Sequence, residues 1–270
     1  MNIFYKASAF IKKDFLIQIS YKTSFILDWL HTFVTIVTFY FISKLMGTAV
    51  TPYLIGYSTE YFPFVMVGLI FSGYLNTALQ KFAINIRHEQ LMGTLEAMLV
   101  SPTKMSLIIV GISLWDLIFT SITTVIVLLF GSLTLNVDLS HINFFPSFLI
   151  LAMTIISFSS IGIISAAFVI VLKKGNPINW LIYTFTCFLG GVFFPVEMLP
   201  WGLRTISYFI PATYSLRGLR HAILQGYNFK MLFPDIAALF LFCLLLFPIS
   251  IWVFIKSVNQ AKIRGSLAHY

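Results

Sequence analysis

The chain has 270 residues, of which 59% are hydrophobic and only 10% are charged. A water-soluble domain usually carries about 25% charged residues, so this composition excludes an ordinary soluble enzyme or binding domain. The net charge is +8, from 17 Lys and Arg against 9 Asp and Glu. In so apolar a chain we expect the basic residues in short loops at the membrane edges, where they set topology, and not in a nucleic-acid-binding surface.

Residues 1–22 are too polar to cross a bilayer, although they carry an apolar stripe with helical spacing. In a helix, four apolar residues would share one face: Phe4, Ala7, Ile11 and Phe15. Lys6 and Lys13 would lie on the opposite face. This pattern favours an amphipathic helix lying in the cytoplasmic membrane interface over the alternative, a frayed terminus with chance periodicity.

Six longer apolar runs follow, and a helix needs about 20 such residues to cross a bilayer. They are roughly Ser24–Met46, Phe62–Ala83, Met105–Leu133, Phe145–Leu172, Ile178–Val196 and Ile236–Ile255. The first run is too long for the core of a cleavable signal peptide, so we interpret it as a retained span. The sequence therefore predicts an all-α, polytopic membrane protein with six transmembrane helices in a single domain, residues 1–270.

The distribution of positive charge predicts the orientation of these spans. With both termini in the cytoplasm, twelve basic residues lie inside: Lys6, Lys12, Lys13, Lys22, Lys81, Arg87, Lys104, Lys173, Lys174, Lys256, Lys262 and Arg264. Five lie outside: Lys44, Arg204, Arg217, Arg220 and Lys230. Because cytoplasmic loops carry the excess of Lys and Arg, we expect a multi-pass protein of the cytoplasmic (inner) membrane with both termini inside.

The most polar connection, residues 84–104, follows the second span. Gly93 should break any helix that continues from the span, Thr94 can cap a new short helix, and Glu96 would complement the helix dipole. Pro102 should end this helix. Its apolar residues would be Leu95, Met98 and Leu99. Such a helix could dock into a groove of another protein, or it could rest on the membrane interface.

Two acidic residues fall inside predicted spans. Asp116 lies near the middle of the third span, where a charge is costly unless it is paired or hydrated. It could line a substrate path, be protonated, or bond to a neighbouring helix. Asp28 lies nearer the cytoplasmic end of the first span, where water is close, and we expect a structural role for it.

The connection between the fifth and sixth spans, residues 197–235, is too long for a turn and too interrupted to cross the membrane. Pro200 can begin one helix and Pro211 a second, each of about 10–14 residues. This length is typical of re-entrant or interfacial helices, so we expect an external gate here. Arg217 and Arg220 could meet the anionic headgroup of a lipid-linked substrate, or they could anchor the helix to the phosphates of the bilayer.

Two stretches of the chain resemble the signatures of a known family. The first, Glu-x-x-x-Gly-Thr-Leu-Glu-x-x-Leu-x-Ser-Pro, runs from Glu89 to Pro102, and the second, Gly-Gly-Val-Phe-Phe-Pro-Val-Glu-Met-Leu-Pro, runs from Gly190 to Pro200. The later Ile-Pro-Ala-Thr-Tyr of residues 210–214 fits as well. Together with the length, the spans and the orientation, these motifs resemble the type-2 ABC exporter permeases over essentially the whole chain.

The resemblance implies a membrane subunit that forms a homodimer, or pairs with a similar permease, and binds two copies of a separate ABC ATPase. ATP and Mg²⁺ would bind that ATPase, and we expect no cofactor on this chain, whose sequence has no G-x-x-x-x-G-K-[ST] loop. The ATPase-coupling positions would be Glu89, Gly93, Thr94, Leu95, Glu96 and Pro102. The gate or substrate path would include Asp116, Gly190, Gly191, Pro195, Pro200, Arg217 and Arg220.

The leading hypothesis is export of an amphipathic, drug-like or lipid-linked molecule, including lipo-oligosaccharides and polysaccharides, with membrane lipid as a further partner. The Gly-Thr-Leu-Glu motif favours the drug and lipo-oligosaccharide branch. The chain also departs from the polysaccharide branch, because residues 173–177 lack the Phe-Arg-Asp expected there. A secondary transporter or channel without an ATPase is the alternative, although such proteins usually show internal repeats or several buried charges. We expect no enzyme, because the histidines are scattered and no Gly-x-Ser-x-Gly motif is present.

Overall fold

The computed structural model describes residues 3–54, 56–101, 103, 105–172 and 177–263, and within these ranges every regular element is a helix. The α-helices are α1 Ile3–Ser20, α2 Lys22–Met46, α3 Tyr61–Asn76, α4 Phe82–Leu91, α5 Thr94–Val100, α6 Met105–Thr134, α7 Phe144–Leu172, α8 Pro177–Leu189, α9 Trp201–Ser207, α10 Pro211–Leu224 and α11 Phe229–Ile263. Three shorter elements are the 3₁₀-helices η1 Gly47–Tyr53 and η3 Val196–Met198 and the π-helical turn η2 Thr77–Lys81. The prediction of an all-α chain is confirmed for the described residues.

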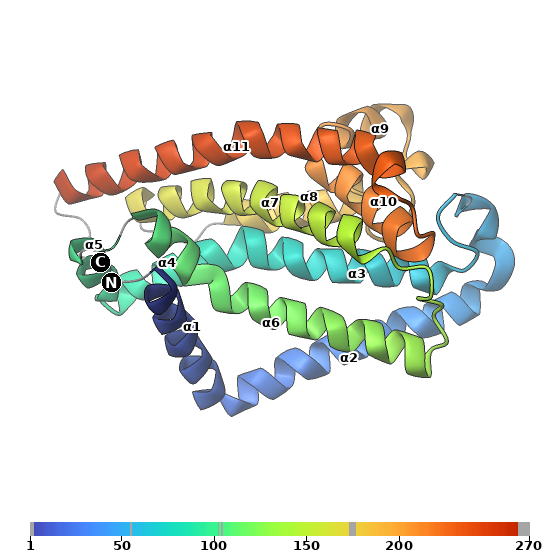
Figure 1. Ribbon diagram of the computed structural model, residues 1–270, viewed down its shortest axis with the longest axis horizontal. Helices are drawn as coiled ribbons and strands as arrows, with labels where there is room; N and C mark the ends of the chain where they lie inside the picture. The colour runs from blue at the N-terminus through green and yellow to red at the C-terminus, as the bar shows by residue number, and fades with distance from the viewer. Residues whose placement is uncertain (1–2, 55, 102, 104, 173–176, 264–270) are drawn as a thin grey trace.

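Five helical stretches in these ranges are long and apolar enough to cross a bilayer: Phe25–Tyr53, Tyr61–Leu91, Val110–Thr134, Phe144–Phe168 and Phe229–Gln260. They correspond to the first four predicted spans and the sixth. The long helices α2, α3, α6, α7 and α11 run lengthwise through the molecule, with α4, α5 and the end of α11 at one end and α9 and α10 at the other (Figure 1). The two ends are called the α5 end and the α10 end below.

The fifth predicted span, Ile178–Val196, is not one helix. α8 has 13 residues and ends at Leu189, which gives it a length of only about 20 Å at 1.5 Å per residue. Gly191 then adopts a φ of 82°, a conformation that L side chains rarely adopt and that does not continue a helix. Hydrophobicity alone suggested a continuous helix, but the glycine turn interrupts it.

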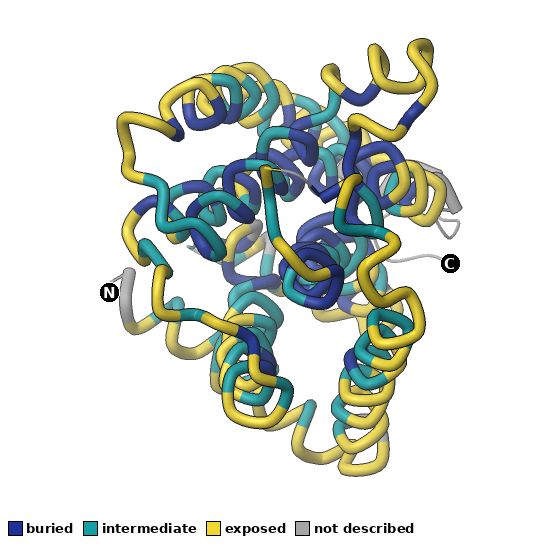
Figure 2. Tube along the Cα trace, turned by 90° about the vertical axis from the view of Figure 1, so that its right-hand side faces the viewer, coloured by how far each residue is buried: buried dark blue, intermediate teal, exposed yellow. Residues whose placement is uncertain are grey.

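The core of the bundle surrounds α3. Its residues Phe64, Phe71 and Leu75 are fully buried, and the ring of Phe71 packs edge-on against Phe158 of α7 at 6.2 Å. α7 in turn packs along α11, and α10 packs on both. Figure 2 shows buried residues in the middle of the bundle and exposed residues on its rim.

The rim is apolar, as expected of a surface that faces lipid. Phe33 of α2, Leu129 of α6 and Trp252 of α11 are each about half exposed or more, at 49%, 54% and 62%. Burial from water cannot hold such helices together in a membrane, so close packing and interhelical hydrogen bonds must do so.

One such close contact lies at the π-helical turn η2. Gly162 of α7 packs directly on this turn, because a Cβ atom built at Gly162 would lie 2.3 Å from the carbonyl oxygen of Ala78. The Nδ2 of Asn179 in α8 donates a hydrogen bond to the next carbonyl, that of Leu79, at 2.9 Å. A small residue and a side-chain amide thus join three helices at one irregular turn.

We expect Gly162→Val to lower the free energy of unfolding by about 1–3 kcal/mol, because two helices must separate to admit the side chain. The measurement is the melting temperature of the purified protein in detergent. Gly202→Val in α9 is the matched control, since a Cβ atom at Gly202 meets nothing within 4 Å. Equal melting temperatures for the two variants would contradict this account of Gly162.

Candidate functional site

The junction between α4 and α5 is a tight turn at one end of the bundle. Gly93 has a φ of 71°, in the left-handed region that favours glycine. Its N–H donates to the carbonyl of Gln90 at 3.1 Å, and the N–H of Met92 donates to the carbonyl of His88 at 3.0 Å. The predictions that Gly93 ends the first helix and that a short second helix follows are confirmed.

Thr94 has a different role from the predicted helix cap. Gly93 occupies the cap position and offers no side chain, while the Thr94 hydroxyl donates to the carboxylate of Glu89 and contacts the Glu89 carbonyl at 3.3 Å. The left-handed turn at Gly93 causes this difference, because it directs the start of α5 back toward α4.

Glu89 lies where three helices meet and is only 8% exposed. Lys13 of α1 forms an ion pair with the same carboxylate that accepts from Thr94, and the Lys13 ammonium also lies 3.2 Å from Asp14. Burial lowers the pKa of Lys13, but the Glu89 and Asp14 carboxylates raise it more, so the net change is upward and the ammonium stays charged. One carboxylate thus connects α1, α4 and α5.

Further contacts hold α1 along α6. The ring of Phe10 fills the space at Gly111, where a Cβ atom would lie 2.7 Å from it. Trp115 of α6 donates its indole N–H to Gln18, and its ring packs on Phe15 at 5.0 Å. The predicted N-terminal helix is confirmed as a helix, but Phe15 of the expected stripe stays 40% exposed, and Phe10 makes the close contact.

The α5 end presents an apolar surface beside this network. Leu91, Met92 and Val100 are 58%, 63% and 80% exposed, whereas Met98 packs against the bundle. The backbones of Leu95 and Glu96 belong to α5, but their side chains lie outside the described part of the structure, as does Pro102. Their predicted coupling roles stay predictions.

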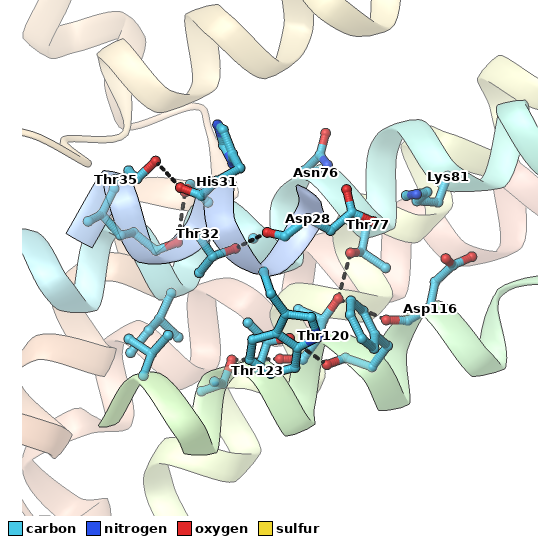
Figure 3. Close-up of a pocket in the computed structure, with 18 of the residues that line it drawn as sticks. Asp28, His31, Thr32, Thr35, Asn76, Thr77, Lys81, Asp116, Thr120 and Thr123 are labelled. Carbon is cyan, nitrogen blue, oxygen red and sulfur yellow. Dashed lines mark hydrogen bonds between the residues drawn. The ribbon is translucent and has the colours of Figure 1, made fainter. Parts of the chain in front are cut away.

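A cavity of about 310 Å³ with several polar side chains in its lining lies within the predicted membrane layer, between α2, α3–η2 and α6. Figure 3 shows the side chains that α2, α3–η2 and α6 contribute to it. These include Asp28, His31, Thr32 and Thr35 of α2, Asn76, Thr77 and Lys81 of α3–η2, and Asp116, Thr120 and Thr123 of α6. The same cavity is lined by the rings of Trp29, Phe119 and Tyr183.

Asp116 lies at one end of this cavity with two partners. Its Oδ2 accepts a hydrogen bond from Asn85 Nδ2 at 2.7 Å, and the same amide donates to the Ile112 carbonyl at 2.9 Å. Lys81 lies beside Asp116 and attracts it electrostatically (Figure 3). Of the roles proposed for Asp116, bonding to a neighbouring helix is confirmed, and its position leaves a place in a substrate path open.

Arg217 pairs with protein at the α10 end. Its Nε donates to Asp235 Oδ1 of α11 at 2.9 Å, and Asp235 is 5% exposed. The predicted apolar face of α10 is confirmed, since its members are all buried: Leu216, Leu219, Ala222 and Ile223. Arg217 therefore joins α10 to α11, with its side chain one-third exposed.

Arg220 faces inward, and the expectation that it contacts headgroups is wrong for this structure. The residue is 2% exposed, and its guanidinium donates to the carbonyls of Phe64 at 3.2 Å and Val192 at 3.0 Å. It also stacks on the Phe64 ring, 3.4 Å from the centroid. Gly68 makes room for it, because a Cβ atom there would lie 3.2 Å from the guanidinium and 2.3 Å from the Val192 carbonyl.

The predicted gate glycines and prolines shape the chain between α8 and α10. Gly190 packs on Ala212 of α10, since a Cβ atom there would lie 2.7 Å from the Ala212 methyl. Pro195 precedes η3, and Pro200 precedes α9, which has 7 residues and is shorter than predicted. Because α9 and α10 both contact α8, these residues connect three neighbouring helices at the α10 end of the bundle. A gating role for them is a prediction.

Comparison with known proteins agrees with this architecture. The family model described as ABC-2 type transporter matches residues 7–224, which is most of the chain. The chain belongs to this family. It is also 26% identical over 232 residues to "Inner membrane transport permease YadH" of Escherichia coli (strain K12) and to the protein of the same name from Shigella flexneri, covering 80% of this chain and 86% of each relative.

This ABC-2 type transporter chain is therefore a multi-pass inner-membrane protein and the membrane subunit of an ABC transporter. Family membership indicates a transport subunit rather than an enzyme, and such subunits generally work with an ABC ATPase. The match includes both the α4–α5 junction and α10, so the two regions with recognisable motifs belong to the family domain.

The structure brings together some predicted residues and adds others. Glu89, Gly93 and Thr94 form one cluster, whereas Asp116 lies in the cavity. The other gate candidates lie at the α10 end, on or between α8 and α10: Gly190, Gly191, Pro195, Pro200, Arg217 and Arg220. Sequence reasoning missed Lys13 as the partner of Glu89. It also missed Lys81 as a neighbour of Asp116. The position of this lysine near the end of an apolar run could have marked it as a candidate.

Proposed function

We propose that this chain is the membrane-spanning subunit of an ATP-driven exporter that moves an amphipathic, drug-like or lipid-linked molecule outward, including lipo-oligosaccharides or polysaccharides. Two copies of a separate ATPase would bind two copies of the chain, or one copy and a similar permease. The α5 end would then be cytoplasmic, with six crossings completed by α8 together with the segment that follows it. The resemblance of the α4–α5 motif to exporter permeases supports this arrangement.

The observation that carries the proposal is the shared carboxylate of Glu89. A short helix that must transmit the motion of an ATPase needs a stiff connection to the membrane helices. Glu89 supplies one, because it bonds to Thr94 at the start of α5 and to Lys13 on α1 while lying on α4, the continuation of α3. Movement of α5 would therefore reach α1 and α3 together.

The exposed apolar residues of the α5 end support the same proposal. Leu91 at the end of α4, Met92 in the turn and Val100 at the end of α5 expose apolar side chains at this end of the bundle. Exposed apolar side chains of this kind suit contact with a partner protein. An uncoupled secondary transporter or channel would need no such docking surface. That alternative would instead predict transport that continues when ATP is absent.

A photo-crosslinking residue placed at Val100 tests where the partner binds. Val100 and Leu133 are similarly exposed, at 80% and 78%, but they lie at opposite ends of the molecule. We expect p-benzoylphenylalanine at Val100, introduced in native membranes, to capture a chain that carries an ATP-binding P-loop. The same residue at Leu133 should capture none. Capture at Leu133 but not at Val100 would contradict the proposed docking end.

A further inference from the structure

We propose that the cavity between α2, α3–η2 and α6 binds an amphipathic organic cation. This inference rests on the proposed function, because it names the class of cargo that the exporter would carry. A cavity of about 310 Å³ falls in the size range of small-molecule sites, about 300–1,000 Å³. The cavity lies among membrane-spanning helices, so the polar side chains in its lining suggest a binding role. Polar and ionisable side chains are costly in a bilayer unless they face a cavity or one another.

The hydroxyl groups of the cavity present acceptors. Thr32, Thr35 and Thr123 each donate to a carbonyl four residues earlier in their own helix, at 3.0, 2.8 and 3.0 Å. Thr120 does the same with the Asp116 carbonyl, so the bond between Thr77 and Thr120 must use the Thr77 proton. A hydroxyl that has used its proton can only accept, and these side chains therefore favour a ligand rich in donors.

The ionisable groups of the cavity favour the same ligand. Two carboxyl groups, those of Asp28 and Asp116, and one amine, that of Lys81, line it. Asp116 is already bonded to Asn85 and lies beside Lys81. Among the described side chains, Asp28 has neither a hydrogen-bond nor an ion-pair partner, so its charge is available to a ligand. The expectation that Asp28 is structural is not supported by any contact in the described ranges.

Aromatic rings line the same space. Trp29 and Phe119 pack edge to face at 5.8 Å, and the ring of Tyr183 enters the lining from α8. The faces of aromatic rings attract cations, and their apolar area suits the body of an amphipathic molecule. An anionic headgroup would instead meet the unpaired carboxylate of Asp28. The combination of hydroxyl acceptors, a carboxylate without a partner among the described side chains, and aromatic rings therefore selects an organic cation.

Equilibrium binding of tetraphenylphosphonium to the purified permease in lipid nanodiscs tests the inference. Tetraphenylborate has nearly the same shape and the opposite charge, so it is the matched control ligand. We expect saturable binding of the cation, no competition by the anion, and at least about tenfold weaker cation binding after Asp28→Asn. Glu60→Gln should bind as the wild type does, because Glu60 is exposed and outside the cavity.

A second variant keeps the test decisive if removal of the carboxylate disturbs folding. Thr32→Lys places an ammonium one helical turn from Asp28, where it can pair with the carboxylate, and should abolish cation binding. Unchanged cation binding in both Asp28→Asn and Thr32→Lys, or equal binding of the two probe ions, would overturn the inference. The binding measurement needs no ATPase, so absence of cation binding would leave the crosslinking evidence for an ATPase partner intact. Failure of the crosslinking experiment would likewise leave the binding result intact.

Discussion

Replacing Glu89 by Ala should uncouple the permease from its ATPase while leaving the chain in the membrane. The substitution removes the group that holds Lys13 and Thr94 together. Loss of a buried ion-pair partner costs about 3–5 kcal/mol, and because Lys13 is about one-third exposed we expect about 2 kcal/mol here. That corresponds to roughly a 30-fold loss of productive α5 docking, measured as ATPase retained during purification.

Two further variants separate the ion pair from a general loss of stability. Glu60→Ala is the control, because Glu60 is an exposed carboxylate without an ion pair in the described ranges. The double variant Lys13→Glu with Glu89→Lys should regain part of the docking, since the charges are exchanged and the new lysine can donate to the Thr94 hydroxyl. Normal ATPase retention by Glu89→Ala would show that this carboxylate has no part in coupling.

Replacing Arg220 by Met should be the most destabilising single change at the α10 end. Met fills similar space but leaves the Val192 carbonyl without its guanidinium donor and weakens the contact to Phe64. An unsatisfied buried polar group costs about 1–3 kcal/mol, so with the lost stacking we expect about 2–4 kcal/mol. The measurement is thermal unfolding of the purified permease in detergent.

Arg204→Met provides the matched control for Arg220. Arg204 lies on α9 and is exposed, and among the described residues its side chain donates a hydrogen bond only to the Tyr208 hydroxyl, at 3.1 Å. Its replacement should change the melting temperature little. Arg220→Lys should fall between the two, because an ammonium can reach one carbonyl but lacks the planar fork that spans both. If Arg204→Met and Arg220→Met melt alike, the inward role assigned to Arg220 is wrong.

Local chemistry accounts for what the sequence predicted well. Gly93 and Pro211 act through their own backbones, so the end of α4 and the start of α10 could be located without knowing the packing. The periodicity of α10 likewise identified its buried face. The length of α8 was misjudged because hydrophobicity continues past Leu189, whereas the turn depends on the left-handed conformation of Gly191.

The residues that sequence reasoning missed depend on contacts between distant segments. Lys13 and Glu89 are separated by 76 positions and meet because α1 returns along α6 to the end of α4. Arg220 looked equivalent to Arg217 in the sequence. In the structure, Gly68 on α3 leaves space for Arg220, whereas Asp235 on α11 binds Arg217. Neither partner can be chosen from the sequence of α10 itself.

The central claim is that this permease works with a separate ATPase bound at its α5 end. The most direct measurement is purification of the chain from native membranes in mild detergent, with identification of the accompanying chains and assay of ATP hydrolysis. We predict that a chain with an ATP-binding P-loop accompanies the wild type in about equal amount, that the complex hydrolyses ATP, and that Glu89→Ala loses the partner. Purification of an intact permease with no such chain and no ATP hydrolysis would contradict the account.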